Sequence, residues 1–265
     1  MLLNSVVIVL REFLEAALLV SVLLVMSRRM RLGRGWLVGA LLVGLAGAVA
    51  YAHFLAAVSE LFEGVGQELT NALLQFGVFA GLVLVVFLVA RRHGHLATRH
   101  RFLTLAMAAT VALAISREGS EIIIFVSGFM QMESLVMSVS LGSMAGAAIG
   151  SSIGILLYYL LLAIPERPAT GVSLVLLSLA AASMCSQATK LLIQADWIAV
   201  AGPVWDSSGV IPEQSLVGQL LYALVGYEAT PTAAEVAVYG GSIVTLCTVA
   251  VLGWTLLKAA EEDAR

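Results

Sequence analysis

Two copies of one charged pattern interrupt an otherwise apolar sequence. Residues 11–15 read Arg-Glu-Phe-Leu-Glu, and residues 117–121 read Arg-Glu-Gly-Ser-Glu. Each copy lies inside a long apolar stretch, so both are predicted to lie near the middle of a membrane. A charged side chain at the bilayer centre costs about 2.5–3.5 kcal/mol on insertion scales. We therefore expect these side chains to face the interior and to neutralise one another, a ligand, or both: Arg11, Glu12, Glu15, Arg117, Glu118 and Glu121.

The spacing within each copy suits the binding of a cation. Residues three or four apart share one face of a helix, so Glu12 and Glu15 point the same way and Arg11 lies within reach of Glu15. If the helices that carry the two copies cross at the motifs, four carboxylates meet two guanidiniums. Carboxylate oxygens favour hard cations such as Mg²⁺, Ca²⁺, Mn²⁺ and iron. We predict no catalytic residues and no enzymatic activity, but a metal site of Glu12, Glu15, Glu118 and Glu121, balanced in charge by Arg11 and Arg117.

Two other interpretations of the motifs stay open. The charged groups could be neutralised ion pairs that only hold helices together, although buried ion pairs contribute little net stability. They could also form a proton relay that works without metal, because intramembrane carboxylates occur in such relays. Both interpretations place the same six side chains in the interior.

The composition predicts an all-α, polytopic membrane protein. Hydrophobic residues make up 60% of the 265 residues and charged residues only 12%, and the mean hydropathy is +1.00. A soluble domain carries about 25% charged residues. The cysteines, Cys185 and Cys247, lack a metal-ligand spacing and are expected to be packing residues. Because Arg11, Glu12 and Glu15 interrupt the first apolar stretch, we expect a retained membrane span and not a signal peptide.

Seven stretches are long and apolar enough for a transmembrane helix of about 20 residues. They cover residues 2–27, 35–59, 69–90, 102–130, 134–163, 171–195 and 234–257, within a single transmembrane domain of residues 1–265. Glycines recur every four residues in the fifth stretch, which predicts close packing against another helix: Gly142, Gly146, Gly150 and Gly154. The connector 196–233 contains an apolar patch, 216–225, that predicts a short helix at the outer membrane surface.

The basic residues of the connectors predict the orientation. Connectors after the second, fourth and sixth stretches contain no Lys or Arg. By the positive-inside rule the N-terminus lies outside and the tail 258–265 lies in the cytoplasm. The basic residues on the cytoplasmic side are Arg28, Arg29, Arg31, Arg34, Arg91, Arg92, Arg99, Arg101, Arg167, Lys258 and Arg265. We therefore predict a multi-pass protein of the cell inner (cytoplasmic) membrane.

The two motifs also predict an internal repeat. An odd number of spans separates the two motif helices, so these helices run in opposite directions. Residues 1–100 and 101–195 then form an inverted repeat of three plus three helices, followed by the outer loop 196–233 and an extra C-terminal helix, 234–257. Transporters with inverted repeats bind their substrate between the repeats, near the middle of the membrane.

The outer connectors are rich in acidic residues. An acidic surface concentrates cations, so we predict an outer access route at Glu60, Glu63, Glu68 and Glu228. The alternative is that these connectors lack bases only because of the topology. Lys190, near the outer end of the sixth stretch, is expected to extend toward the membrane surface, and Gln75 is expected to make an ordinary polar contact.

These motifs resemble those of the high-affinity iron permeases, which comprise the fungal permease that works with a multicopper oxidase and the bacterial EfeU-type permeases. The family pattern is Arg-Glu-Gly-Leu-Glu in the first and fourth spans. The charged positions match in both copies here, with Phe13 in place of Gly and Ser120 in place of Leu. The stretches 60–64, 204–206 and 226–231 are also similar to the family. The resemblance implies seven spans and iron uptake, with the four motif glutamates handling the metal.

We therefore expect an iron permease that moves iron ions, ferrous or ferric, into the cell through the carboxylate site. The alternatives are a permease for another divalent metal such as lead, a proton-coupled carrier of organic cations, and a membrane scaffold without transport. The expected partners are membrane lipid and a separate periplasmic or extracellular oxidase or iron-delivery protein. Oligomerisation stays open, and no nucleic acid is expected.

Overall fold

Helices make up most of the described chain. The computed structural model describes residues 1–90, 97–199 and 202–262, with side chains except at 97–99, 166–167, 254 and 256–262. In these ranges, extended pairing is limited to one isolated bridge between Pro203 and Thr232, so the all-α prediction is confirmed. The elements in order are α1 Leu2–Arg29, α2 Gly35–His53, α3 Leu55–Ser59, the 3-10 helix Leu61–Gly64, α4 Gly66–Ala90, α5 Ala97–Phe129, α6 Glu133–Ala163, α7 Glu166–Gln194, α8 Leu216–Val225 and α9 Ala233–Glu262.

Five of the helices are long and apolar enough to cross a membrane: α2, α4, α6, α7 and α9. The motif helices α1 and α5 are also long enough, with 28 and 33 residues. They are not among the five because each motif adds three charged residues to its helix. Several long apolar helices in one chain are the pattern of a multi-pass membrane protein.

The predicted second stretch is two helices and not one. Apolar residues continue through 35–59, yet α2 ends at His53 and α3 begins at Leu55. Elsewhere the helices extend up to five residues past the predicted ends, as at Ala97 of α5 and Glu262 of α9. Helical hydrogen bonding does not require apolar side chains, so a helix can continue beyond its apolar stretch.

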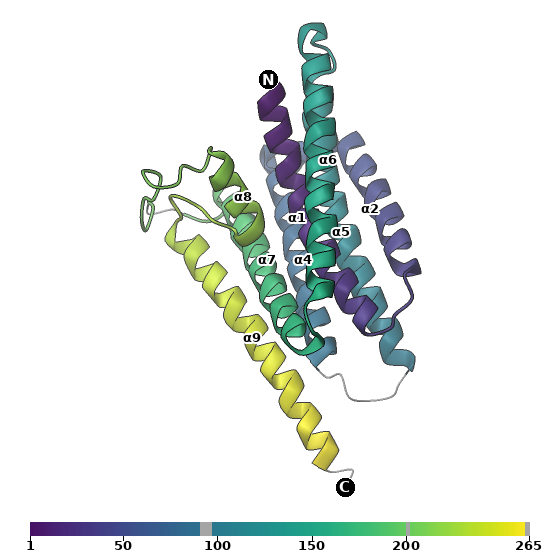
Figure 1. Ribbon diagram of the computed structural model, residues 1–265. Helices are drawn as coiled ribbons and strands as arrows, with labels where there is room; N and C mark the ends of the chain where they lie inside the picture. The colour runs from purple at the N-terminus through teal and green to yellow at the C-terminus, as the bar shows by residue number, and fades with distance from the viewer. Residues whose placement is uncertain (91–96, 200–201, 263–265) are drawn as a thin grey trace.

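The helix ends separate into two groups (Figure 1). The N-terminus, α8 and the α5–α6 connector lie at one end, and the α1–α2 and α6–α7 connectors lie at the other end with the C-terminus. At this second end, Arg29 Nη2 donates to the carbonyls of Leu161 and Ile164, at 2.8 Å each. Some of the basic residues used for the orientation lie outside the described residues or side chains: Arg91, Arg92, Arg99, Arg167, Lys258 and Arg265.

Glycine faces allow two pairs of helices to pack closely. α6 packs along α1, and α2 packs along α5. A Cβ added at Gly146 would lie 2.5 Å from the Val6 carbonyl oxygen, and one at Gly150 would lie 2.6 Å from the Phe13 Cβ. The predicted close approach of the fifth apolar stretch is therefore confirmed. Phe13 fits in place of the family's glycine because the opposite residue is Gly150.

The largest apolar core lies beside the motifs, toward the end that carries the α1–α2 connector. It is built from the part of α1 that follows the motif, from the second half of α4, from the first half of α5 and from α7. Its fully buried members include Leu19, Leu23, Leu82, Met107 and Leu177. This core forms an apolar boundary on one side of the charged motifs, and a smaller apolar cluster of Leu10, Leu14 and Ala223 joins α1 to α8.

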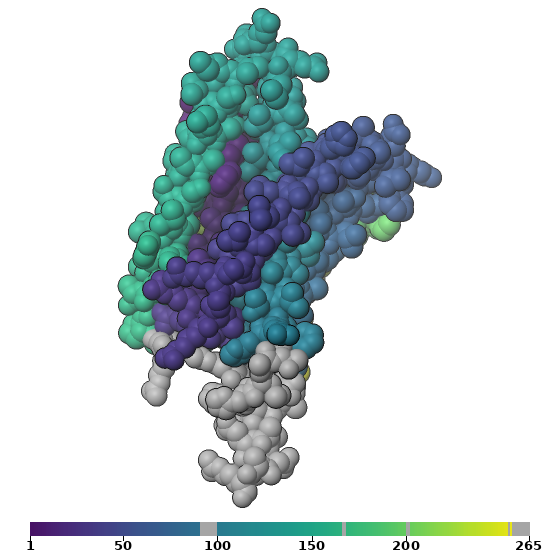
Figure 2. All heavy atoms as spheres, turned by 90° about the vertical axis from the view of Figure 1, so that its right-hand side faces the viewer, coloured from purple at the N-terminus to yellow at the C-terminus, as the bar shows by residue number. Residues whose placement is uncertain are grey.

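The outward face of α2 is apolar (Figure 2). Viewed from this side, α2 lies diagonally across α5, and part of α1 is visible between α2 and α6. The exposed side chains of α2 include Val38, Leu42, Val43, Leu45 and Val49. An apolar exposed surface over this length matches a helix that faces lipid.

Candidate metal centre

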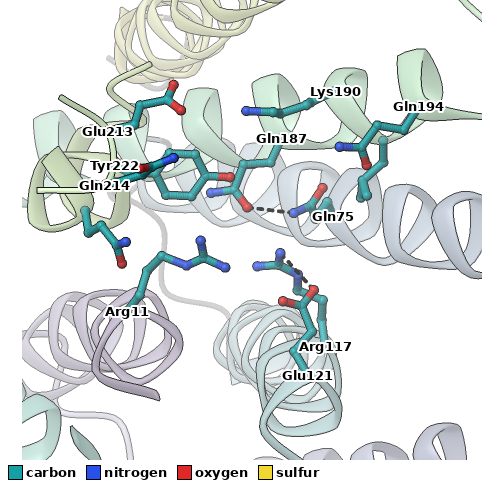
Figure 3. A pocket seen from close by; sticks show the side chains of 12 residues that line it. Arg11, Gln75, Arg117, Glu121, Gln187, Lys190, Gln194, Glu213, Gln214 and Tyr222 are labelled. Atoms are coloured by element: carbon teal, nitrogen blue, oxygen red, sulfur yellow. Dashed lines mark hydrogen bonds and ion pairs between the residues drawn. The ribbon is translucent and has the colours of Figure 1, made fainter. Parts of the chain in front are cut away.

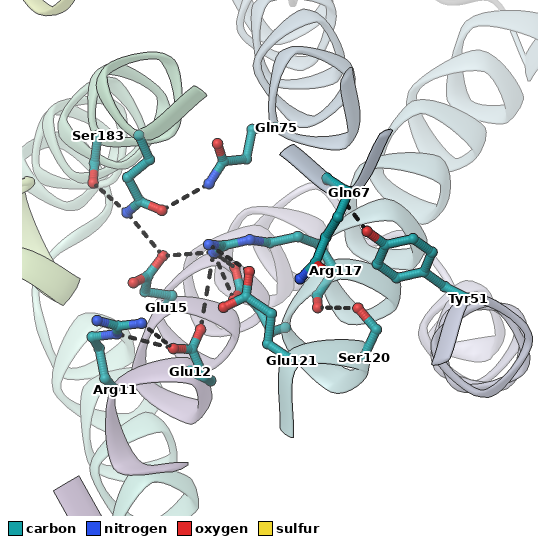
Figure 4. A network of polar contacts seen from close by, with 12 residues as sticks. Arg11, Glu12, Glu15, Tyr51, Gln67, Gln75, Arg117, Ser120, Glu121 and Ser183 are labelled. Atoms are coloured by element: carbon teal, nitrogen blue, oxygen red, sulfur yellow. Dashed lines mark hydrogen bonds and ion pairs between the residues drawn. The ribbon is translucent and has the colours of Figure 1, made fainter. Parts of the chain in front are cut away.

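Three motif carboxylates lie together where α1 and α5 meet. One oxygen from each of Glu12, Glu118 and Glu121 lies within 4.8 Å of the others. Glu12 is 1% exposed, Glu118 is 2% exposed, and Glu121 is partly exposed. Hard oxygen ligands at this separation could coordinate a single divalent cation after small side-chain movements. We call these three residues the carboxylate triad, of which Figure 4 labels Glu12 and Glu121.

Glu15 lies outside the carboxylate triad, although the helical spacing predicted that it would join the other three. Its Oε2 accepts hydrogen bonds from Arg117 Nη1 at 3.3 Å and from Gln187 Nε2 at 3.1 Å. Glu15 lies one helical turn beyond Glu12. At this position along α1 the neighbouring helix α7 presents the Gln187 side-chain amide, and the Glu15 carboxylate accepts its hydrogen bond.

Arg117 lies among all four motif glutamates. Its Nη1 lies 2.7 Å from Glu118, 3.3 Å from Glu15 and 4.0 Å from Glu12, and its Nη2 lies 3.0 Å from Glu121. The side chain is 7% exposed. One guanidinium therefore lies where it can offset part of the negative charge that the four carboxylates would carry together.

Arg11 pairs with its neighbour Glu12, and not with Glu15 as the spacing suggested. Its Nε and Nη2 donate to Glu12 Oε1 at 2.9 and 2.6 Å. The guanidinium also lies over the ring of Tyr222, 5.2 Å from its centroid. A cation over an aromatic face is attracted electrostatically. Tyr222 comes from α8, so this placement depends on how the outer loop folds back onto α1.

Two buried glutamines link α4 and α7 to the motif helices. Gln75 Nε2 donates to Gln187 Oε1 at 2.8 Å, and Gln187 Nε2 donates to Glu15 and, at 3.2 Å, to Ser183 Oγ. Gln75 is fully buried and Gln187 is 5% exposed. The sequence reasoning treated Gln75 as an ordinary contact and missed the role of Gln187. The available signal was an amide side chain inside an apolar stretch, since such groups hydrogen-bond across membrane helices.

A first cavity, of about 350 Å³, lies between the motifs and α8 (Figure 3). Its charged lining consists of Arg11, Arg117, Lys190, Glu121 and Glu213. A second cavity, of about 360 Å³, lies between α1, α4, α5 and α7. It is lined by Glu12 and Glu121 of the carboxylate triad, so the triad borders open space.

The four glutamates of the predicted outer access route do not line one common cavity. Glu68 lines the second cavity. Glu60 and Glu63 are exposed at the turn before α4 and line none of the described cavities. Glu228 forms an ion pair with Lys190 and lines a third, separate pocket beside α9. Lys190 is therefore engaged by an outer glutamate and does not extend freely to the membrane surface.

Glu228 has an unusual protonation equilibrium for an outer-loop residue. Burial raises the pKa of Glu228 to about 7, against the opposing effect of the Lys190 ammonium. Loss of hydration disfavours the charged carboxylate, and one partially exposed cation does not fully compensate for it. This group therefore titrates close to neutral pH.

Comparison with known proteins agrees with the resemblance seen in the motifs. The model of the family described as "Iron permease FTR1 family" matches residues 2–262. The chain is 28% identical over 255 residues to the "Ferrous iron permease EfeU" of Escherichia coli O157:H7, covering 88% of this chain and 89% of the relative. It is 26% identical over 248 residues to the protein of that name from Yersinia pestis, covering 88% and 87%.

A relative from Escherichia coli (strain K12), 28% identical over 253 residues, is named "Putative inactive ferrous iron permease EfeU". No solved structure matches the chain. Because the family model spans nearly the whole sequence, this protein belongs to the iron permease FTR1 family, a family of transporters.

Proposed function

We propose that this protein is an iron permease of the cytoplasmic membrane that moves iron ions into the cell through the carboxylate triad. The observation that carries the proposal is the meeting of Glu12, Glu118 and Glu121, from two copies of one motif, within 4.8 Å inside the protein. Such carboxylates are costly in a membrane unless they serve a ligand or a pathway. Glu15 acts beside the triad, as a fourth carboxylate that anchors Arg117.

The transported ion is proposed to be Fe²⁺. The relatives from Escherichia coli O157:H7 and Yersinia pestis are called ferrous iron permeases. The four motif glutamates and two motif arginines carry a formal charge of minus two when all are ionised, which a divalent cation neutralises. Oxygen ligands also suit Mn²⁺ and other hard divalent ions, so competition by Mn²⁺ and Pb²⁺ in the uptake assay would define the selectivity.

The proposed membrane architecture has seven spans in an inverted repeat. The spans are α1, α2, α4, α5, α6, α7 and α9, with the N-terminus outside. If α1, α2 and α4 correspond to α5, α6 and α7, then the packing of α1 on α6 corresponds to the packing of α5 on α2, and both pairs are present. The Gln75–Gln187 bond joins α4 to its counterpart α7. These exchanged pairings support an approximate two-fold relation between the halves.

Release of iron into the cell requires a rearrangement of the helices. The apolar core separates the carboxylate triad from the end that carries the α1–α2 connector, whereas the cavities lie on the side of the triad next to α8. This arrangement corresponds to an outward-facing state. Because α1 packs on α6 and α5 packs on α2, relative movement of these two pairs is the proposed step that opens the inner side.

Uptake of radioactive Fe²⁺ by cells tests the assignment. E12Q and E118Q each remove a carboxylate charge from the triad at nearly constant volume, so uptake should fall at least tenfold at equal amounts of protein in the membrane. E133Q is the matched control, because Glu133 is exposed at the start of α6. Unchanged uptake in both E12Q and E118Q would reject the triad as the transport site.

A further inference from the structure

Three residues that line the second cavity each carry a buried oxygen atom without a hydrogen-bond partner. Among the described residues, Glu12 Oε2, Glu68 Oε2 and Asn71 Oδ1 accept no hydrogen bond, although Glu12 Oε2 lies 4.0 Å from Arg117 Nη1, and all three residues line this cavity. Asn71 is only 5% exposed. A buried acceptor without a donor costs about 1–3 kcal/mol. Because three residues around one space each carry such an atom, we expect a ligand to supply the missing partner.

Two of these residues, Glu68 and Asn71, belong to α4 and are not members of the carboxylate triad. Glu68 and Asn71 are three positions apart, so they lie on one face in the first turns of α4. Glu12 belongs to the triad and lines the same cavity. The cavity therefore joins an outer pair of oxygens on α4 to the deeper carboxylates of α1 and α5.

The ligand that fits these atoms is a cation. All three are acceptors, so an anion would find no donor among them. The charged lining of this cavity is Glu12, Glu68, Glu121 and Arg11, and Arg11 is already held by Glu12 and Tyr222. With every charged lining residue counted, the formal charge is minus two around the second cavity (one base, three acids) and plus one around the first (three bases, two acids). A cation is therefore attracted to the second cavity and repelled from the first.

The size of the cavity fits an ion that keeps part of its water. About 360 Å³ is roughly twelve times the volume of a water molecule in the liquid, taken as ~30 Å³. Small divalent cations retain several waters when protein oxygens supply only part of the coordination shell. A carboxylate and an amide oxygen, with one shared carboxylate, are ligands suited to such an ion.

We propose that Glu68 and Asn71 form a second cation subsite, outward of the carboxylate triad, where a partly hydrated divalent metal ion binds before it reaches Glu12, Glu118 and Glu121. Glu12 belongs to the triad and also lines the second cavity, so it can remain a ligand while an ion passes from one position to the other. The proposal rests on the proposed function, because it supplies the step that precedes binding at the triad.

Equilibrium dialysis of the full chain in lipid nanodiscs with Mn²⁺ tests this subsite. Mn²⁺ is a hard divalent ion that is stable in air and can be counted. The wild type should bind two ions. E68Q and N71A should each weaken one of them by at least about tenfold, the lower end of the loss seen when a partner of a metal ligand is removed. N71D keeps an oxygen at the same place and should retain two ions, as should the control E133Q.

The variant E118Q distinguishes failure of the proposed transport site at the triad from failure of the subsite at Glu68 and Asn71. This variant should lose the other ion and keep the one bound by Glu68 and Asn71, since Glu118 does not line the second cavity. Fewer than two ions in the wild type, or two tightly bound ions in both E68Q and N71A, would overturn the subsite. Two ions in E118Q would instead count against the proposed function. If N71A does not give a monodisperse protein, E68Q decides the result, and N71D serves only as the control that keeps an oxygen at position 71.

Discussion

Replacing Arg117 with Met tests whether one guanidinium neutralises the buried glutamates. Arg117 lies 2.7 Å from Glu118, 3.0 Å from Glu121 and 3.3 Å from Glu15. Removing one partner of a buried ion pair costs about 3–5 kcal/mol, because the other charge stays buried without compensation. A carboxylate can take up a proton and recover part of this cost. We therefore expect R117M to lose about 3 kcal/mol of stability in the absence of metal.

Metal should reverse much of this loss. In the wild type, a cation at the triad has to displace Arg117 from Glu118 and Glu121, whereas in R117M these carboxylates are free. The variant should consequently bind Mn²⁺ more tightly than the wild type. A ligand at one hundred times its dissociation constant stabilises the protein that binds it by about 2.7 kcal/mol, which is close to the expected loss. Tighter binding should also slow release, so uptake by R117M should fall.

The assay is thermal unfolding of the purified protein in nanodiscs, with EDTA and with excess Mn²⁺. A change of 1 kcal/mol shifts the midpoint by roughly 2–4 °C for a chain of this size, so R117M in EDTA should unfold roughly 6–12 °C below the wild type. R11M is the comparison, because the Arg11 side chain is 32% exposed and should cost less. A difference below about 2 °C for R117M in EDTA, or equal stabilisation of both proteins by Mn²⁺, would refute the reasoning.

Two further predictions concern the packing and the outer loop. G150L should destabilise the protein by about 1–3 kcal/mol through overpacking, because even a Cβ would lie 2.6 Å from the Phe13 Cβ. G39L should be nearly neutral, because a Cβ there has open space around it, and equal yields of folded protein for the two variants would contradict the close packing of α1 on α6. Burial raises the pKa of Glu228 from its ordinary value near 4.5 to about 7, so its stabilising contribution is complete below pH 4.5 and is lost as the pH rises through 7. The unfolding midpoint of the wild type should therefore fall relative to that of E228Q between pH 5.5 and 8, and a difference that does not change with pH would contradict the raised pKa.

The long helices could be predicted from the sequence because a membrane leaves few choices. Backbone groups in lipid must bond within the chain, so an apolar stretch of sufficient length is helical. The break at Phe54 could not be foreseen, because apart from His53 the neighbouring residues on both sides of it are mostly apolar. The ends of α5 and α9 also lie beyond their apolar stretches, since a helix can continue into the polar region.

The candidate site was partly predictable for the same reason. Charges inside apolar stretches must face inward, and this requirement led directly to Glu12, Glu118 and Glu121. The sequence offered no means of seeing that Glu15 would turn to Gln187. It also did not show that Asn71 would leave an oxygen unpaired in a cavity with Glu68, because an asparagine in an apolar helix has many potential partners.

The sequence by itself determined the helical membrane fold, the family and the set of charged side chains that the interior has to accommodate. Spacing along a helix decides which face a residue occupies, and hydropathy decides its depth. Only the tertiary structure decided which groups meet: Arg117 with four glutamates, Arg11 with Glu12 and Tyr222, and the α4 pair Glu68 and Asn71 with Glu12 and Glu121 around one cavity. These pairings depend on how closely α1, α4, α5, α7 and α8 approach one another, which side-chain packing between helices sets.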